Sequence, residues 1–341
     1  MLQNKEILIN KTIVVTGGTG SFGKTLVKKL LDTEVKKIRI FSRDENKQDE
    51  MRNELSNNRL EFYIGDIREK GALDVCFTDA DFVFHAAALK QVPSCEYFPF
   101  EAVKTNIIGS QNVLDSSIKN NIKNVVMLST DKAVMPINAM GISKSMMEKL
   151  TFTYGFNQNA HIKTIFNVTR YGNVMGSRGS VIPIFISKML NDQEISVTDP
   201  GMTRFMMSLE ESVNLVLFAM KNGNQGELFV QKAPSASIEV LISALEKIFN
   251  LKAKIKLIGF RHGEKMHETL LSSDEAMRSE DLGDYFRVRP DNRDLNYSLP
   301  NESLTRKNVE EFNSFNSKFL DVNELAEVLL KQDFVKKYLN K

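Results

Sequence analysis

The sequence lacks the features of several classes of protein. Its only cysteines, Cys76 and Cys95, are not spaced as metal ligands, and without a secretory context they predict a reducing cytoplasm. No apolar run approaches the roughly 18 residues of a membrane span, and no signal-peptide pattern precedes the strand expected from Thr12. The net charge is only +2, from 45 basic and 43 acidic residues, so there is no basic surface typical of nucleic-acid binding. We expect a cytoplasmic protein with no membrane insertion, nucleic-acid partner or metal site.

What the sequence does contain is ordinary for a large globular chain. Its 341 residues are 42% hydrophobic and 26% charged, which is enough to bury a sizeable core and to form two lobes. There is no internal repeat and no low-complexity segment. Local motifs therefore carry the functional prediction.

The first motif is a glycine turn between a strand and a helix. Residues 12–16 form a short β-branched strand, and apolar residues from Phe22 to Leu31 recur at helical spacing. The turn residues predicted to bind a dinucleotide are Gly17, Thr19, Gly20, Ser21, Phe22 and Gly23. Glycines in this position let the backbone approach a pyrophosphate at the positive helix N-terminus. The Gly17-x-x-Gly20-x-x-Gly23 spacing is typical of short-chain-type dehydrogenases.

The residue after the second strand predicts which dinucleotide binds. Residues 37–41 form that strand, and Arg43 lies 20 residues past Gly23, where the group facing the adenosine ribose is expected. An acidic residue there takes the 2′-hydroxyl of NAD, whereas an Arg favours the 2′-phosphate of NADP. Asp44 is one residue late for that role, and the structural alternative for Arg43 is a plain surface charge. We predict NADP, with Ser42 and Arg43 at its ribose.

Two further strand ends carry cofactor-binding candidates. They are Asp66 and Ile67 after the third strand, and Ala86, Ala87 and Ala88 after the fourth. Asp66 is placed to contact the adenine amine, and the small alanines leave room for the pyrophosphate and ribose. His85 is predicted to be a hydrogen-bonded strand-end residue without a catalytic role.

The alternation of strands and helices predicts an α/β fold with a Rossmann-like, doubly wound parallel sheet. The later strands are expected at 60–68, 81–88, 125–128 and 164–168, with a helix at 101–114 and a last amphipathic helix over 322–339. Residues 227–230 read as one more strand that rejoins the first lobe. We predict a cofactor-binding domain of residues 1–174 plus about 206–233. Residues 175–205 and 234–341 are predicted to form a smaller, mostly helical substrate domain.

The fifth strand ends in the stretch around which the rest is organised. Its apolar residues 125–128 give way to Thr130-Asp131-Lys132, at the end of the sheet where open α/β folds bind ligands. Asn138 can cap a helix that carries Met140 and Lys144 four residues apart on one face. This is the layout of a dehydrogenase-type Ser/Thr, Tyr and Lys site, with Met140 where the Tyr is expected. A solvated turn followed by a helix with a core Met is the structural alternative.

Together these segments resemble the extended short-chain dehydrogenase/reductase superfamily. Within it they look like the capsule-type, 5-inverting UDP-N-acetylglucosamine 4,6-dehydratases of bacterial surface-polysaccharide synthesis. The resemblance extends from the glycine turn to residues 291–297, and its specific motifs are Thr130-Asp131-Lys132 and the segments 87–93, 170–174 and 261–265. Retaining dehydratases have a Glu after that Asp, where this sequence has Lys132. A Met at the position of Met140 resembles the branch of the family that makes precursors of N-acetyl-L-fucosamine. The resemblance also implies a homo-oligomer such as a hexamer.

The resemblance implies a reaction that oxidises C4 of the sugar, eliminates the C6 hydroxyl and then reduces C6. Oxidation makes C5–H acidic, so the protein needs an acid for the C6 oxygen, a base for C5 and an acceptor for the C4 hydroxyl proton. Asp131 suits the first role and Lys132 the second. We expect burial near Lys144 and the oxidised nicotinamide to lower the pKa of Lys132. Thr130 is expected to hydrogen-bond the C4 oxygen and Lys144 to bind the nicotinamide ribose, while Met140 is expected to form the pocket floor. The group that takes the proton of the C4 hydroxyl is either Lys132 or a water.

The remaining candidates are predicted to bind the UDP-sugar. They are Lys90, Asn173, Val181, Thr198, Met202, Arg204, Arg261 and Glu264. Arg204 and Arg261 suit the diphosphate, because Arg donates two parallel hydrogen bonds to a phosphate. Glu264 suits the uridine ribose hydroxyls, and Asn173 a phosphate or the N-acetyl group. In the structural alternative each is a surface charge or part of an ion pair.

Two other functions stay open. A UDP-N-acetylglucosamine 4-epimerase shares cofactor and substrate, but it normally needs the Tyr that Met140 replaces. A non-catalytic NADP-binding regulator is the other, and the presence of Asp131, Lys132 and Lys144 argues against it.

Overall fold

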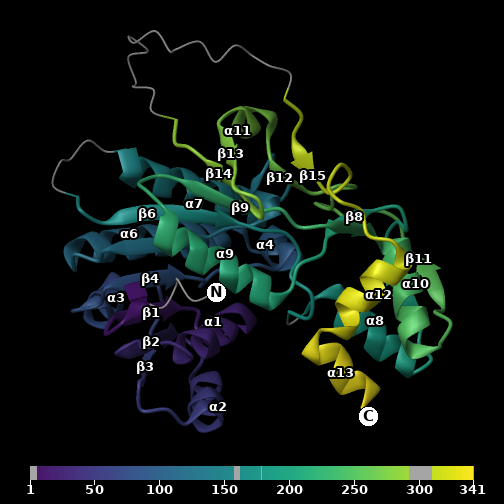
Figure 1. The fold of residues 1–341 in the computed structure, drawn as a ribbon, viewed down its shortest axis with the longest axis horizontal. Helices are drawn as coiled ribbons and strands as arrows, with labels where there is room; N and C mark the ends of the chain where they lie inside the picture. Colours follow the sequence, from purple (N-terminus) through teal and green to yellow (C-terminus); the bar gives the residue numbers. More distant parts are fainter. Residues whose placement is uncertain (1–5, 157–161, 178, 292–308, 341) are drawn as a thin grey trace.

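The computed structural model describes residues 6–156, 162–177, 179–291 and 309–340 (Figure 1). Its central sheet has nine strands. In spatial order they are β13 (Ser279–Asp281), β14 (Tyr285–Val288), β9 (Leu228–Gln231), β6 (Ile165–Arg170), β5 (Asn124–Leu128), β4 (Phe82–His85), β1 (Thr12–Thr16), β2 (Lys37–Ser42) and β3 (Leu60–Ile64). The strands from β9 to β3 pair in parallel, and β14 and β13 add an antiparallel edge. The predicted Rossmann-like α/β fold is confirmed.

Helices cover both faces of this sheet. The helices α1 (Ser21–Leu31), α2 (Glu45–Leu55) and α9 (Leu209–Asn222) pack on one face, and α3 (Lys70–Phe77), α6 (Gly109–Lys119) and α7 (Ala139–Phe156) on the other. Side chains alternate across β1, so that Ile13 and Val15 pack with Leu30 while Val14 packs with Leu73. Burial on both faces explains why these strands are almost continuously apolar.

Two predicted helices differ from those observed. Residues 101–114 are divided among α5 (Pro99–Ala102), a π-helical turn η3 (Val103–Ile108) and α6. The turn inserts one residue, because the Gly109 N–H bonds Lys104 O. Asn106 in this turn bonds both the N–H and the carbonyl of Leu89, at 2.8 and 2.9 Å, which fixes the loop after β4. The last helix is broken into α12 (Val322–Leu330) and α13 (Asp333–Leu339) by the extended backbone of Gln332.

A second, smaller lobe lies at the right of Figure 1. It contains α8 (Val181–Leu190), α10 (Ile238–Phe249), α12 and α13 around a separate apolar core. Its short strand pairs are β7 (Ile195–Val197) with β11 (Ile255–Leu257), and β8 (Thr203–Phe205) with β10 (Ser235–Ser237). The strand β9 rejoins the main sheet beside β6, as expected from residues 227–230. The predicted division into domains stays a prediction, and β13 and β14, which come from its substrate part, extend the central sheet.

A buried arginine connects the sheet to the C-terminal part of the chain. Arg170, at the end of β6, is 2% exposed and pairs with Glu148 of α7 at 2.5 and 3.0 Å. It also donates to Glu275 of α11 (Ser273–Met277) at 2.8 and 3.0 Å, and to the carbonyl of Leu270 in β12 (Thr269–Leu271) at 2.9 Å. Because both carboxylates accept two hydrogen bonds each, this ion pair fixes orientation as well as distance.

Both cysteines are buried and free. Across the described ranges, no helix is long and apolar enough to cross a bilayer. Of the resembling segment 291–297, all but Asp291 lies outside the described residues.

Candidate active site

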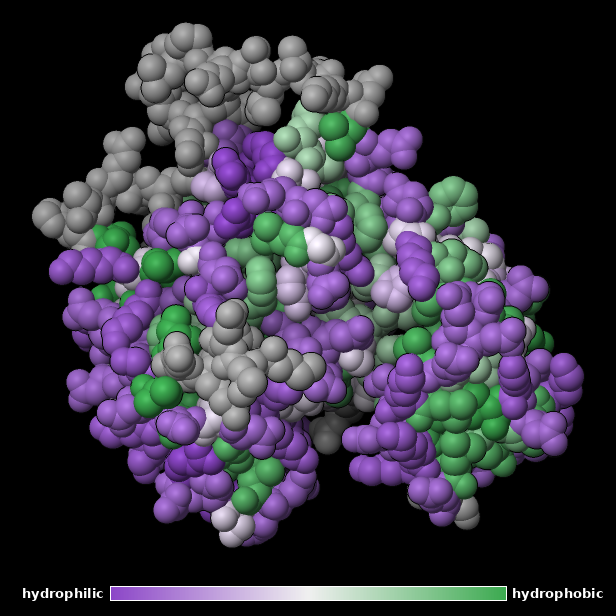
Figure 2. All heavy atoms as spheres, viewed as in Figure 1, coloured by the Kyte–Doolittle hydropathy of each residue, from purple (hydrophilic) through white to green (hydrophobic). Residues whose placement is uncertain are grey.

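A cleft of about 1320 Å³ lies at the carboxyl ends of the parallel strands. Figure 2 shows the surface hollowed between the main body and the second lobe. The predicted site residues all line this cleft: Gly17, Thr19, Gly20, Ser21, Phe22, Gly23, Ser42, Arg43, Asp66, Ile67, Ala86, Ala87, Ala88, Lys90, Thr130, Asp131, Lys132, Met140, Lys144, Asn173, Val181, Thr198, Met202, Arg204, Arg261 and Glu264. Sequence segments far apart are thus brought together, while the role of each residue stays a prediction.

The turn after β1 leaves no space for a side chain. Gly17 has φ +68°, and a Cβ there would lie 2.7 Å from the backbone nitrogen of Ala87. The Gly20 N–H bonds Gly17 O at 3.0 Å, and a Cβ on Gly23 would lie 2.6 Å from that oxygen. The helix α1 begins at Ser21, directly after Gly20, and its first residues line the cleft. This bare backbone next to a helix N-terminus fits the pyrophosphate of a dinucleotide.

The end of β2 presents Arg43 to the cleft. Its guanidinium lies 3.3 Å from Asp66 Oδ2, and its side chain is 53% exposed. Burial raises the pKa of Asp66, but hydrogen bonds from Arg68 and the charge of Arg43 outweigh it, so the net shift is downward. Asp44 instead caps α2 by accepting the Lys47 N–H at 3.0 Å. Arg43 and Asp44 both line the cleft, and the role of Arg43 at the ribose stays a prediction.

The end of β5 buries a carboxylate among donors. Asp131 is fully buried, and its Oδ1 accepts hydrogen bonds from Thr130 Oγ1, the Lys132 N–H and Lys132 Nζ at 2.7, 2.9 and 3.1 Å. The Asp131 N–H in turn donates to the carbonyl of Tyr171 at 3.1 Å. Three donors thus converge on one oxygen of this side chain. Oδ2 is buried and finds no hydrogen-bond partner in the described part of the chain.

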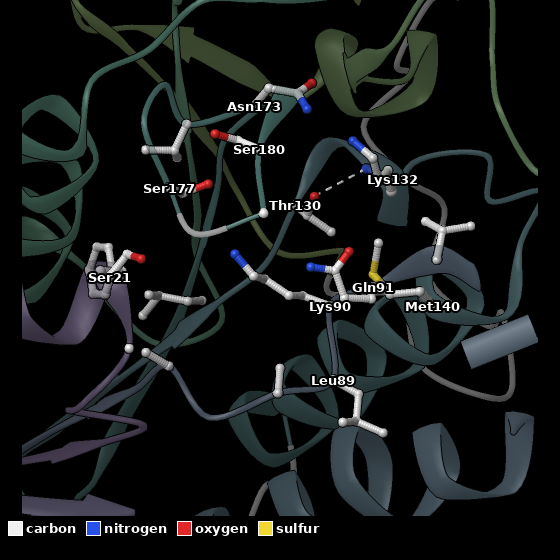
Figure 3. Close-up of a pocket in the computed structure, with 18 of the residues that line it drawn as sticks. Ser21, Leu89, Lys90, Gln91, Thr130, Lys132, Met140, Asn173, Ser177 and Ser180 are labelled. Atoms are coloured by element: carbon white, nitrogen blue, oxygen red, sulfur yellow. Dashed lines mark hydrogen bonds between the residues drawn. The ribbon is translucent and has the colours of Figure 1, made fainter. Parts of the chain in front are cut away.

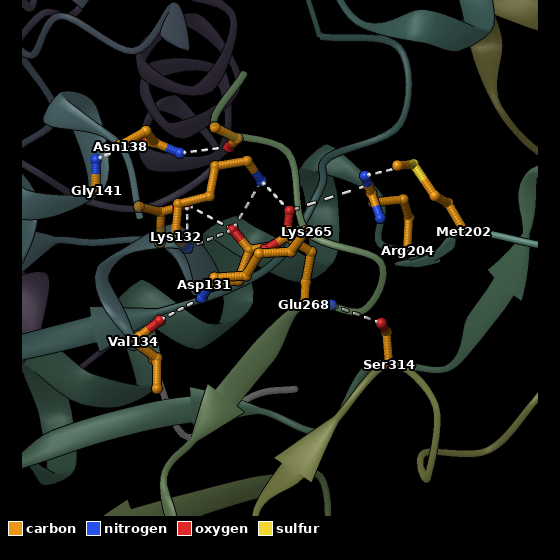
Figure 4. Close-up of polar contacts among 12 residues, drawn as sticks. Asp131, Lys132, Val134, Asn138, Gly141, Met202, Arg204, Lys265, Glu268 and Ser314 are labelled. Carbon is orange, nitrogen blue, oxygen red and sulfur yellow. Dashed lines mark hydrogen bonds and ion pairs between the residues drawn. The ribbon is translucent and has the colours of Figure 1, made fainter. Parts of the chain in front are cut away.

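The expectation of a lowered pKa for Lys132 is wrong. Burial does lower it, but the charges of Asp131 and Glu268 outweigh burial, and the pKa of Lys132 is raised. Its Nζ lies 3.4 Å from Glu268 Oε1, whose other neighbour is Arg204 Nε at 4.0 Å (Figure 4). The ammonium therefore lies between two carboxylates.

The helix α7 holds the other two catalytic candidates. Asn138 caps it by accepting the Gly141 N–H at 2.8 Å, as predicted. Met140 is 3% exposed and packs against Cys95 and Ala102 at the edge of the cleft (Figure 3). One turn later, Lys144 Nζ donates to the carbonyl of Leu128 at 2.6 Å. Burial lowers the pKa of Lys144 to about 8, although the charge of Glu148 opposes the shift.

The predicted substrate-binding side chains approach from both lobes. In Figure 3, Lys90 points into the pocket from the loop after β4, and Asn173 lies on the opposite side near Ser177 and Ser180. Arg204 already donates to the carbonyl of Thr203 at 2.7 Å, whereas Arg261 is 58% exposed and lies 4.0 Å from Glu264. Val181, Thr198 and Met202 complete this wall.

The segment that carries Arg261 and Glu264 is attached to the loop after β5. Lys265 Nζ donates to the carbonyl of Val134 at 2.7 Å, and Asn138 Nδ2 donates to the carbonyl of Gly263 at 2.9 Å. His262 lies 3.0 Å from Glu96. The two predicted binding regions, for diphosphate and for sugar, are therefore in direct contact.

Comparison with known proteins decides the family. The model of a polysaccharide biosynthesis protein matches residues 13–290, and the model of its C-terminal part matches residues 291–336. The chain belongs to the polysaccharide biosynthesis protein family. A Rickettsia bellii (strain OSU 85-389) relative named UDP-glucose 4-epimerase is 51% identical over 339 residues, which are 98% of this chain and 99% of that protein.

Two solved structures are similar to this chain. Pen from Bacillus thuringiensis is 36% identical, with a TM-score of 0.88 over 96% of this chain and 98% of that one. DesIV of Streptomyces venezuelae, a dTDP-glucose 4,6-dehydratase solved with NAD, is 19% identical, with a TM-score of 0.67 over 75% of this chain and 86% of that one. The second likeness shows the shared fold alone.

For this family member, sequence reasoning missed Glu268. This residue is 3% exposed, lines the cleft and faces Lys132. The available signal was an acidic residue directly before the apolar strand β12 and three residues after Lys265. Among the described residues, no three His, Cys, Asp or Glu side chains are grouped to hold a metal ion.

Proposed function

We propose that the protein catalyses 4,6-dehydration of UDP-N-acetylglucosamine with inversion at C5, giving UDP-2-acetamido-2,6-dideoxy-β-L-arabino-hexos-4-ulose for surface-polysaccharide synthesis. The observation that carries this proposal is the ion pair of the buried Asp131 with the partly exposed Lys132 at the end of β5. Elimination requires an acid and a base at adjacent carbons, C6 and C5, and neighbouring side chains at one strand end suit that requirement.

The raised pKa of Lys132 means that it rests as an ammonium, and the hydrogen bond to Asp131 offers a way to form the free amine. As an ammonium, Lys132 cannot take the C5 proton, and as a carboxylate, Asp131 cannot protonate the C6 oxygen. Transfer of one proton from Lys132 Nζ to Asp131 Oδ1, along their 3.1 Å hydrogen bond, produces an amine and a carboxylic acid together. This pair can then remove the C5 proton and protonate the departing hydroxyl.

The dinucleotide is NADP in this proposal, held by the glycine turn after β1 and by Arg43. When bound, it supplies the reversible two-electron oxidation at C4. Lys144 lies on the same cleft and is proposed to bind the nicotinamide ribose, while Thr130 bonds the C4 oxygen. Met140 is proposed to form an apolar floor under the sugar, since it has no proton to exchange.

The uridine diphosphate is proposed to lie against the second lobe. Arg204 and Arg261 supply positive charge there, Glu264 accepts from ribose hydroxyls, and Lys90 and Asn173 contact the phosphate or the N-acetyl group. Glu264 Oε2 is buried and lacks a hydrogen-bond partner among the described residues, which suits an acceptor for a ligand hydroxyl. We propose that the working protein is a cytoplasmic homo-oligomer.

A second candidate is 4-epimerisation of a UDP-sugar, favoured by the name of the Rickettsia bellii relative. Both reactions begin with oxidation at C4, so cofactor binding does not separate them. Epimerisation needs no acid and base for C6 and C5, and gives the pair Asp131–Lys132 no task. Both reactions also need a group to take the C4 hydroxyl proton, which Met140 cannot do; Lys132 and a water are the candidates for it, so this need does not separate the two reactions.

Proton NMR of UDP-N-acetylglucosamine incubated with the protein and NADP in deuterium oxide tests the proposal. We expect a new C6 methyl signal, deuterium at C5 and the β-L-arabino configuration from the earliest time points. A C4 epimer that keeps its C6 hydroxyl would support the epimerase, and an unchanged substrate would support a non-catalytic protein. An early D-xylo product would mean that the protein dehydrates the substrate but retains configuration at C5.

A further inference from the structure

Lys132 faces two carboxylates, and Glu268 carries the second of them, after Asp131. It comes from the residue before β12, far along the chain from β5, and its side chain is only 4% exposed. Its Oε1 lies 3.4 Å from Lys132 Nζ and 4.0 Å from Arg204 Nε. Its Oε2 is buried and has no hydrogen-bond partner among the described residues. A buried carboxylate this poorly satisfied is costly, which argues for a functional purpose.

The backbone of Glu268 is held by hydrogen bonds that do not involve the ion pair. The Glu268 N–H donates to Ser314 Oγ at 2.9 Å, and the Ser314 N–H donates to the Glu268 carbonyl at 2.8 Å. Ser314 is held in turn by Thr203, whose hydroxyl lies 2.6 Å from its own. The backbone that carries this carboxylate is thus anchored beside Lys132 by hydrogen bonds of its own.

The groups that face Lys132 are two anions and two cations. Asp131 and Glu268 stabilise its ammonium, while Arg204 and Lys265 oppose it. Asp131 is the nearer anion, yet it is also the proposed acceptor of the Lys132 proton. Glu268 is therefore the group that adjusts how readily this proton leaves without receiving it.

We propose that Glu268 is a positioning residue of this reaction, which holds Lys132 in place and in its charged form in the resting protein. This inference rests on the function proposed above. By favouring the ammonium, Glu268 keeps the amine and carboxylic acid forms rare until a substrate occupies the cleft. The buried Oε2 is where a substrate hydroxyl or a water can donate, which weakens the hold of the carboxylate on Lys132.

Competitive trace labelling with acetic anhydride over a pH series tests this, with Lys132 modification read by peptide mass spectrometry. In wild type, we expect the titration midpoint of Lys132 to lie above the ordinary lysine range. In Glu268→Gln, which keeps the shape and removes the charge, we expect the midpoint to fall by about 1–3 pH units. The matched control is Glu311→Gln, which removes a carboxylate at the equivalent place on the neighbouring strand. Glu311 directly precedes β15 (Phe312–Asn313), which pairs with β12, and its carboxylate accepts a hydrogen bond from Asn313 at 2.8 Å. We expect this control to leave the midpoint unchanged.

An unchanged Lys132 midpoint in Glu268→Gln overturns the inference. If that variant does not fold, Glu268→Asp replaces it: withdrawing the charge by one methylene should give a smaller downward shift, and no shift overturns the inference. In turnover assays, the acid limb of kcat/KM should move down with the midpoint, whereas a merely structural residue would lower kcat/KM at every pH. Labelling does not depend on turnover, so the two proposals can fail separately. Absence of a dehydrated product refutes the proposed function, whereas an unchanged titration midpoint of Lys132 refutes the role of Glu268.

Discussion

Replacing Gly141 with alanine should disturb the catalytic loop without unfolding the protein. Gly141 lies in the first turn of α7, and a Cβ on it would lie 3.1 Å from the Lys132 carbonyl carbon and nearer still to its oxygen. Ordinary contacts begin at 3.4 Å, and the oxygen is backbone, so Lys132 has to retreat. The required movement is on the order of 1 Å, and a misplacement of that size costs about 100-fold in rate. The accompanying strain of about 1–3 kcal/mol is small enough for a chain of this size to remain folded.

The assay is turnover of UDP-N-acetylglucosamine followed by NMR, with thermal unfolding and calorimetric NADP binding measured on the same samples. Gly71→Ala is the matched control, because nothing lies within 4 Å of a Cβ at that position of α3. We expect the control to keep full turnover and to gain about 0.5–1 kcal/mol in helix stability. Wild-type turnover in a folded Gly141→Ala protein would refute the close packing of α7 on Lys132 as a requirement for catalysis.

Three further predictions concern the cofactor, the pocket floor and a buried histidine. Arg43→Ala should weaken NADP binding by about 1.5–3 kcal/mol and NAD binding much less, and equal losses in calorimetric titrations would contradict the ribose-phosphate assignment. Met140→Leu, which nearly conserves volume, should keep much of the turnover, whereas Lys132→Ala should lose almost all of it and still bind the UDP-sugar; an inactive, folded Met140→Leu protein would give the thioether a chemical role. Burial, and secondarily the charge of Lys144, lowers the pKa of His85 to about 3. The unfolded chain therefore binds more protons between pH 6.5 and 3, and the free energy of unfolding should fall by up to about 1.4 kcal/mol per pH unit as the pH drops through that range. Chemical denaturation across this range should show a shallower fall in His85→Gln, and an equal fall would show that other groups dominate.

The sequence predicted the parallel sheet well because the information was local. The first strand begins and ends at the predicted residues, Thr12 and Thr16, since its apolar run is bounded by a polar segment and a glycine turn. The helix cap by Asn138 was likewise readable from a residue type and its spacing. By contrast, the π-helical turn at Val103–Ile108 depends on the tertiary contact between Asn106 and Leu89, which no local pattern signals.

The electrostatics of the candidate site could not be read in the same way. The direction of the pKa shift of Lys132 was not anticipated, because the charge of Asp131 was not weighed against burial and Glu268 reaches Lys132 from a distant part of the chain. The edge strands β13 and β14 were missed for a similar reason: their pairing with β9 is a long-range event. In each case the residue type was visible, and the partner was not.

The arginine at the end of β6 has a mechanical consequence. Arg170 binds Glu148 on α7, the helix that also carries Met140 and Lys144, and it binds the carbonyl of Leu270 two residues after Glu268. One buried guanidinium therefore braces the helix behind the cleft against the strand that brings the second carboxylate to Lys132. We therefore expect this wall of the cleft to keep its shape when a ligand enters or leaves.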